Sequence, residues 1–283
     1  MRARRPASER VFELLCLLAV IAPLAMLAVL VGHVLWLGFD RLEWSFLVGY
    51  PSRFPDRAGI LPGLAGTLNL MFITAVVSLP IGIGTAIYLL EYRGRSRVAR
   101  FVELNIANLA GVPSVIYGLL GLEVFVRTIG IGGSILAGGL TLALLVLPIV
   151  TIAAREALLL VPAELREAGM ALGASRWEVV RGIVLPMAFP TILTGSIFAI
   201  SRAIGEAAPL VVLGALAFVS FVPDGPGSQF TALPVQIFHW VSRPQSGFGV
   251  DAAAGIVVLL ATLVVLNGAA ILLRNRYAAR TRR

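Results

Sequence analysis

Long apolar runs dominate the chain, and short charged segments separate them. Six of the runs are close to the roughly 20 residues that an α-helix needs to cross a bilayer. They cover about residues 13–37, 66–90, 105–127, 134–153, 189–217 and 254–273 of the 283. Because only helices and closed barrels satisfy their backbone polar groups in lipid, this pattern predicts an all-α, polytopic membrane bundle of six transmembrane helices.

Composition and charge support a membrane protein with both termini in the cytoplasm. Hydrophobic residues make up 58% of the chain and charged residues 13%, whereas soluble domains are about half apolar and a quarter charged. All 23 basic residues are arginine. With the N-terminus inside, 17 of them fall in cytoplasmic segments and 5 in external ones, as the positive-inside rule requires. The net charge of +8 therefore reflects topology and calls for no nucleic-acid partner.

The remaining composition offers little for catalysis or metal binding. The basic start and the first apolar run are read as a retained signal anchor, because the run is longer than a cleavable signal usually has. The single cysteine, Cys16, excludes an internal disulfide, and His33 and His239 lack the spacing of a zinc site. We expect no catalytic residue and no metal site in this chain.

A charged segment interrupts the apolar pattern in the second half of the chain. It reads "LREAGMALGASRWEVVRGIVLP" and covers residues 165–186. Pro162 suits a first helical position and Gly173 a residue just past a helix end. Ser175 and Glu178 form a capping-box pattern that begins a second helix, and Pro186 is expected to end it. Helical spacing gives the first helix an apolar face formed by Leu165, Ala168, Gly169 and Leu172. The segment is either a docking element or a linker that rests on its own bundle.

This segment resembles the cytoplasmic EAA loop of ABC-importer permeases, whose pattern is Glu-Ala-Ala, three residues, Gly, nine residues and Ile-x-Leu-Pro. The matching positions are Glu167, Ala168, Gly169, Gly173, Ile183, Leu185 and Pro186. The one departure is Gly169, where alanine is usual; glycine lowers helix propensity by about 1 kcal/mol. The resemblance implies a type I importer permease with the MetI-like fold, in which this loop docks on a separate ATPase and couples ATP hydrolysis to transport.

The chain contains no lysine, and that absence supports the same division of labour. The P-loop that binds ATP requires a lysine that reaches the phosphates. This chain is therefore expected to be no enzyme and to bind no cofactor, with ATP and Mg²⁺ held by the partner chain.

The fifth apolar run carries an ion pair within the membrane. Gly195, Ala199, Ala203 and Ala207 recur every four residues and form a ridge of small side chains, which lets helices approach closely. Arg202 and Glu206 are also four residues apart, so their side chains can pair. Charged groups in a span are costly and usually face a bundle interior or a water-filled path. The pair serves either helix packing or the passage of an anion.

Three further stretches resemble the A-type permeases of phosphate importers. They read "SRAIGEAAP", "IGIGTAIYLLEY" and "FTALPVQIFHWVSRPQ". The resemblance places Arg202 and Glu206 in the substrate path. It implies three kinds of partner in the inner membrane assembly: a C-type phosphate permease, two copies of a cytoplasmic ATPase and an external phosphate-binding protein.

The resemblance also organises the chain into three parts. Residues 1–59 hold the cytoplasmic tail, the first transmembrane helix and an external loop. Residues 60–275 form the permease domain, with the EAA loop at about 154–188, and 276–283 form a basic tail.

Other functions stay open on the sequence alone. Within the same class, the substrate could be another oxyanion such as sulfate, or the chain could be the sister phosphate subunit. A proton-coupled carrier that uses Glu206 as its proton site is the alternative from another class. A membrane enzyme is disfavoured because the spans hold no nucleophile–base pair, and a purely structural protein leaves the EAA spacing without an explanation.

Overall fold

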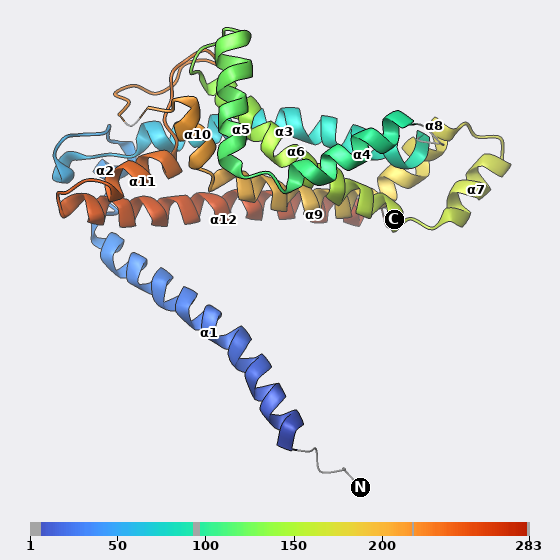
Figure 1. Cartoon of the computed structure of the whole chain (residues 1–283), viewed down its shortest axis with the longest axis horizontal. Helices are drawn as coiled ribbons and strands as arrows, with labels where there is room; N and C mark the ends of the chain where they lie inside the picture. The colour runs from blue at the N-terminus through green and yellow to red at the C-terminus, as the bar shows by residue number, and fades with distance from the viewer. Residues whose placement is uncertain (1–6, 93–96, 217, 282–283) are drawn as a thin grey trace.

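The computed structural model describes residues 7–92, 97–216 and 218–281, and all regular secondary structure in these ranges is helical. Figure 1 shows the α-helices in chain order. They are α1 (Ala7–Gly38), α2 (Trp44–Val48), α3 (Leu61–Ile87), α4 (Arg97–Ala110), α5 (Ser114–Gly121), α6 (Ile135–Leu159), α7 (Ala163–Ala171), α8 (Arg176–Val179), α9 (Leu185–Ile204), α10 (Ala208–Leu213), α11 (Leu233–Val241) and α12 (Gly247–Thr281). Shorter 3-10 or π-helical turns are η1 (Phe39–Arg41), η2 (Pro55–Arg57), η3 (Tyr88–Tyr92), η4 (Leu122–Thr128) and η5 (Val180–Val184).

Five helical segments in the described ranges are long and apolar enough to cross a membrane. They are Val11–Arg41, Leu61–Tyr92, Ile135–Leu159, Arg176–Ile204 and Gly247–Tyr277. They correspond to the first, second, fourth, fifth and sixth apolar runs of the sequence. The third run is also helical but is divided into α4 and the segment Ser114–Thr128, which are bent by 113°. The predicted total of six is reached when this bent pair counts as one span, and the all-α membrane fold is confirmed.

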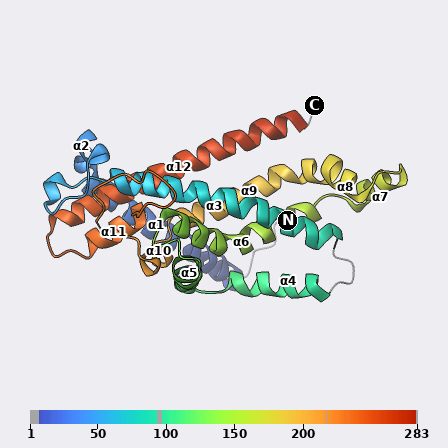
Figure 2. The ribbon, with the colours of Figure 1, turned by 90° about the horizontal axis from the view of Figure 1, so that it is seen from above.

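The bend between α4 and α5 follows from local sequence. Gly111, Val112 and Pro113 form the break, because a residue before proline is driven out of helical geometry. Across the bend, the Tyr117 hydroxyl donates to the Leu109 carbonyl at 2.7 Å. Figure 1 shows α5 standing across the long helices, and Figure 2 views the same helix end-on. The bend therefore directs α5 away from the axis of the bundle.

The centre of the bundle is the pair α3 and α6, which pack along each other with α9 beside them. Small residues allow the close approach: a β-carbon at Gly139 would lie only 2.5 Å from Ile73 Cγ2. Thr74 on α3 donates to the Gly139 carbonyl at 3.2 Å. Two thirds of the most apolar 18 residues of α6 are buried, so α6 is the helix around which the others are arranged.

One end of the bundle, which we call the α11 end, is held together by buried hydrogen bonds between α11 and the start of α3. The Thr67 hydroxyl accepts from the backbone N–H of Leu233 and donates to the Gly63 carbonyl, both at 2.9 Å. The buried amide of Gln236 donates to the Gly59 carbonyl at 2.9 Å. These bonds fix α11 against α3. The stretch "FTALPVQIFHW", residues 230–240, is thus tightly packed at this end, and we call it the plug.

Helix α1 joins the body only near its C-terminal end, where Val31, Val34 and Leu37 are partly buried, and the rest of the helix extends away from it (Figure 1). In the segment Val11–Arg41, none of the most apolar 18 residues is buried. At the junction Gly38 packs on the backbone of α12, where an added β-carbon would lie 2.6 Å from the nitrogen of Ala254. Next to it, Arg41 Nε lies 2.9 Å from the buried carboxylate of Asp251. This junction sets the direction in which α1 leaves the bundle.

Candidate functional site

The Arg202–Glu206 pair lies at a break in the fifth predicted span. Helix α9 ends at Ile204, and α10 begins at Ala208 after a short turn. The predicted continuous helix over 189–217 is therefore wrong at this point, because Gly205 ends α9. Arg202 Nε lies 3.6 Å from Glu206 Oε1, so the two side chains do pair, but across a helix end. The guanidinium also lies where the helix dipole favours a positive charge.

The two members of the pair differ in exposure. The Arg202 side chain is 50% exposed and that of Glu206 is 18% exposed. Arg202 therefore faces outward from this chain's own bundle, whereas Glu206 is more buried against it. A half-exposed guanidinium inside an apolar span needs water or another chain beside it, since lipid solvates charge poorly.

The ridge of small residues on α9 turns inward, as its spacing predicts. Ala199 and Ala203 are completely buried, and a β-carbon at Gly195 would lie 2.4 Å from that of Ala153 on α6. Ala207 lies beyond the end of α9 and is only partly buried. The ridge thus seats α9 on α6 and leaves Arg202 on the adjacent face.

The broken segment is held from the other side by α5. A β-carbon at Gly118 would lie 2.7 Å from the Pro209 carbonyl oxygen, and one at Gly121 would lie 3.0 Å from Leu213 Cδ1, both on α10. The sequence interpretation missed this contact. Its only signal was the spacing of the two glycines in "VIYGLLG", which is also common in ordinary membrane helices. The site is therefore built where two broken helices meet.

The charged loop folds as its capping signals predict. At the end of α7 the N–H of Gly173 donates to Met170 and that of Ala174 donates to Gly169, which is the Schellman arrangement. Gly173 has φ +86°, a left-handed conformation that favours glycine. Ser175 and Glu178 form the predicted capping box at the start of α8. Pro162 is the N-cap of α7, one position before the predicted one.

The second loop helix does not end at Pro186, contrary to the sequence prediction. It continues through the π-helical turn η5 into α9, so residues Arg176–Ile204 form one helical segment. Proline lacks the N–H that an α-helix requires, and an adjacent π-turn shifts the bonding pattern to accommodate it. Pro186 and Leu185 therefore belong to the start of the membrane helix. Ile183 and Leu185 pack against the apolar cluster beneath the loop.

The outward side of α7 carries two of the predicted docking residues, and Leu172 lies exposed just past its end. Glu167 and Ala168 are exposed, and Leu172 is 90% exposed. Gly169, predicted on the same apolar face, turns inward instead. A β-carbon there would lie 2.9 Å from a methyl of Val179. The departure from alanine at this position therefore has a packing reason.

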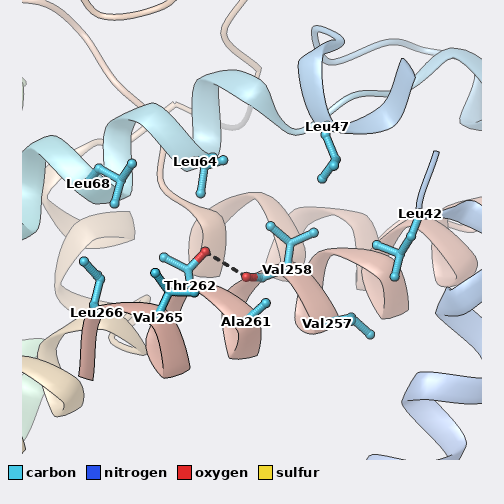
Figure 3. Close-up of a pocket in the computed structure, with 10 residues that line it drawn as sticks. All are labelled: Leu42, Leu47, Leu64, Leu68, Val257, Val258, Ala261, Thr262, Val265 and Leu266. Atoms are coloured by element: carbon cyan, nitrogen blue, oxygen red, sulfur yellow. Dashed lines mark hydrogen bonds between the residues drawn. The ribbon is translucent and has the colours of Figure 1, made fainter. Parts of the chain in front are cut away.

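An apolar pocket of about 440 Å³ lies among η1, α2, α3 and α12. Figure 3 shows its lining, in which the hydroxyl of Thr262 is turned to its own helix and donates to the Val258 carbonyl at 2.8 Å. No charged side chain lines this pocket, so it does not suit an anion. Within the described ranges, no group of three or more His, Cys, Asp or Glu residues could hold a metal ion.

Comparison with known proteins defines the class of this membrane bundle. Residues 78–282 match the family described as "Binding-protein-dependent transport system inner membrane component", and the chain belongs to that family. It is an ABC importer permease, a multi-pass membrane protein that works with an ATPase and a binding protein. It is not an enzyme, and a separate subunit hydrolyses ATP.

Individual relatives and a solved structure show which members of the family this chain is similar to. The chain is 34% identical to "Phosphate transport system permease protein PstA 1" of Mycobacterium tuberculosis (strain CDC 1551 / Oshkosh), over 84% of this chain and 78% of the relative. It is 33% identical to "Probable ABC transporter permease protein YqgI" of Bacillus subtilis (strain 168), over 87% of this chain and 88% of the relative. The fold is also that of a chain of the MetNI methionine ABC transporter, with a TM-score of 0.58 at 19% identity over 79% of this chain and 96% of that one. The predicted MetI-like permease fold is confirmed.

Proposed function

We propose that this chain is the A-type permease subunit of an ATP-driven phosphate importer in the inner membrane, with both termini in the cytoplasm. The observation that carries the proposal is the Arg202–Glu206 pair at the junction of α9 and α10. The phosphate-transport names of several relatives support the choice of anion.

Arg202 provides a positive site for the anion in the translocation path. A guanidinium donates parallel hydrogen bonds to an oxyanion, and it stays charged at every physiological pH. Glu206 competes for the same guanidinium at 3.6 Å, which prevents the anion from being held too tightly. Because Arg202 is 50% exposed, the path is completed by a second permease subunit, for which we propose the C-type phosphate permease.

The α7–α8 loop is the docking element for the ATPase. Glu167, Ala168 and Leu172 present an exposed surface of mixed character, and α7 is too short to be stable without a surface to pack on. We propose two ATPase copies for the whole importer, one for each permease chain, with ATP and Mg²⁺ bound there. An external phosphate-binding protein supplies most of the selectivity, because one arginine cannot separate phosphate from sulfate by geometry alone.

Uptake of labelled phosphate tests this function. Cells with and without the chain are compared at low external phosphate, with excess unlabelled sulfate present. We expect sulfate-resistant uptake to be lost on deletion, and the Arg202→Gln variant to fall to the same level while the assembly remains intact. Arg127→Gln is the matched control, because Arg127 belongs to an exposed pair with Glu123 at 3.0 Å and should leave uptake unchanged.

The contrary outcomes separate the alternatives. Full competition by sulfate would assign another oxyanion. Uptake that follows the proton gradient and ignores ATP depletion would assign a proton-coupled carrier. Normal uptake by Arg202→Gln would show that the ion pair serves packing alone.

A further inference from the structure

The helix α7 touches the rest of the bundle through very few side chains. Of its residues Ala163–Ala171, only Arg166 and Gly169 are not exposed. Gly169 packs on Val179 and Ile183, which belong to the continuation of the same loop. Arg166 is the residue of α7 whose side chain forms hydrogen bonds with other membrane helices in the described ranges.

Arg166 makes three directed contacts at the inner ends of two spans. Its Nε lies 3.0 Å from Glu91 Oε1, in the π-helical turn η3 that ends the α3 span. Its two terminal nitrogens donate to the carbonyls of Leu158 at 2.7 Å and Val161 at 2.6 Å, where α6 ends. One guanidinium thus connects α7 to both α3 and α6.

Arg176 reinforces the same point from α8. Its Nη1 donates to the backbone carbonyl of Glu91 at 2.8 Å. Glu91 is therefore bound through its side chain from one loop helix and through its main chain from the other. Residue 91 is the position at which both helices of the loop are tied to the α3 span.

These contacts are largely removed from water but are not close-packed. The side chains of Glu91 and Arg166 are 10% and 17% exposed. Beside them lies a cavity of about 270 Å³, whose lining includes Leu90, Met170 and Val179. Because apolar packing is incomplete here, the charged hydrogen bonds fix the position of α7 relative to α3.

We propose that Glu91, Arg166 and Arg176 form a coupling clamp that transmits movement of α7 to the inner ends of α3 and α6. Glu91 and Arg166 are positioning residues: they act between the docking surface and the membrane helices and touch neither nucleotide nor anion. The clamp rests on the proposed function, since it needs an ATPase docked on α7 to supply the movement. Without the clamp, α7 stays connected to the bundle through the chain and through Gly169 but moves independently of α3.

The test uses the complete importer, purified with its ATPase and reconstituted in proteoliposomes supplied with the binding protein. Phosphate taken up per ATP hydrolysed is measured for the wild type and for Glu91→Gln. The variant keeps the shape of the side chain but loses the charge. Because a neutral amide cannot pair with the Arg166 guanidinium as a carboxylate does, we expect the ratio to fall by about tenfold or more, while the amount of co-purified ATPase stays at the wild-type level.

Two further variants define the geometry. Arg166→Lys retains the charge, but a single ammonium cannot reproduce a planar fork directed at three acceptors, so the ratio should fall as in Glu91→Gln. Glu123→Gln is the control, because Glu123 forms an exposed pair with Arg127 outside the clamp; its ratio should match the wild type. A merely structural role for Glu91 would lower the yield of complex and leave the ratio unchanged.

The outcomes distinguish the clamp from the function on which it rests. An unchanged ratio in both Glu91→Gln and Arg166→Lys, with a coupled wild type, overturns the clamp alone. Loss of the bound ATPase in these variants also overturns it, because Glu91 would then support docking. A wild-type complex that hydrolyses ATP without moving phosphate overturns the proposed function and the clamp together.

Discussion

The two ends of the bundle each carry a helix of the same length, but one helix is buried and the other is exposed. Helices α11 and α7 each have nine residues. In α11 six of them are buried, with Leu233, Gln236 and Trp240 among them, whereas in α7 only Gly169 is buried. Beyond α7, the apolar side chains of Leu172 and Trp177 are 90% and 53% exposed.

The difference shows which end is complete within this chain. A helix of nine residues is marginal in water and needs a surface to pack on. Helix α11 finds that surface on α3 and α12. Helix α7 instead presents apolar side chains outward beyond the membrane spans, where another protein rather than lipid can cover them. The α11 end is thus packed within this chain, and the exposed α7–α8 end is the half of an interface that the proposed function requires.

The largest expected effect comes from opening the plug. A β-carbon at Gly66 would lie 2.0 Å from the Thr231 carbonyl oxygen, a backbone atom that cannot move without displacing α11. Gly66→Val should therefore prevent the chain from accumulating in the membrane, measured by quantitative immunoblotting of membrane fractions. Gly84→Val is the control, since nothing lies within 4 Å of a β-carbon there. Normal accumulation of Gly66→Val would mean that α11 does not need this contact.

An intermediate effect is expected from a leucine-to-aspartate substitution, made once at each end of the bundle and compared. Leu172→Asp should leave the thermal unfolding of the isolated chain unchanged and reduce ATPase co-purification by about tenfold, since a buried leucine contributes about 1.5–3 kcal/mol. Leu233→Asp places a charge at a completely buried position and should instead lower the unfolding temperature. If Leu172→Asp unfolds the chain as Leu233→Asp does, the α7–α8 end is not an interface.

The smallest effect tests the turn that shapes the interface. Gly173 has φ +86° and open space around it, so Gly173→Ala should cost about 1–2 kcal/mol in local stability through backbone strain alone. Gly182→Ala is matched, because it also has open space but ordinary helical geometry in η5. Faster amide hydrogen exchange in α7 for Gly173→Ala, and not for Gly182→Ala, is the expected result. Equal exchange would show that the turn does not hold α7 in place.

Local features of the loop were predictable because neighbouring residues produce them. The capping box of Ser175 and Glu178 and the left-handed Gly173 depend on contacts within a few residues. The pairing of Arg202 with Glu206 follows from a spacing of four residues in the same way. The prediction failed at Pro186 because the surrounding helices and a π-turn accommodate a proline that would end a helix in water.

The sequence by itself determined that this protein lies in a membrane, since the length and polarity of its apolar runs admit no other solvent. It also determined the turns of the charged loop and the motif spacing that marks a permease. Only the tertiary structure decided that the α4–α5 pair bends across the bundle, that Gly169 turns inward, and that Glu91 meets Arg166 across 75 positions of chain. The physical reason is range: helix length, caps and turns arise from interactions within a few residues, whereas exposure and long-range ion pairs depend on how whole helices pack.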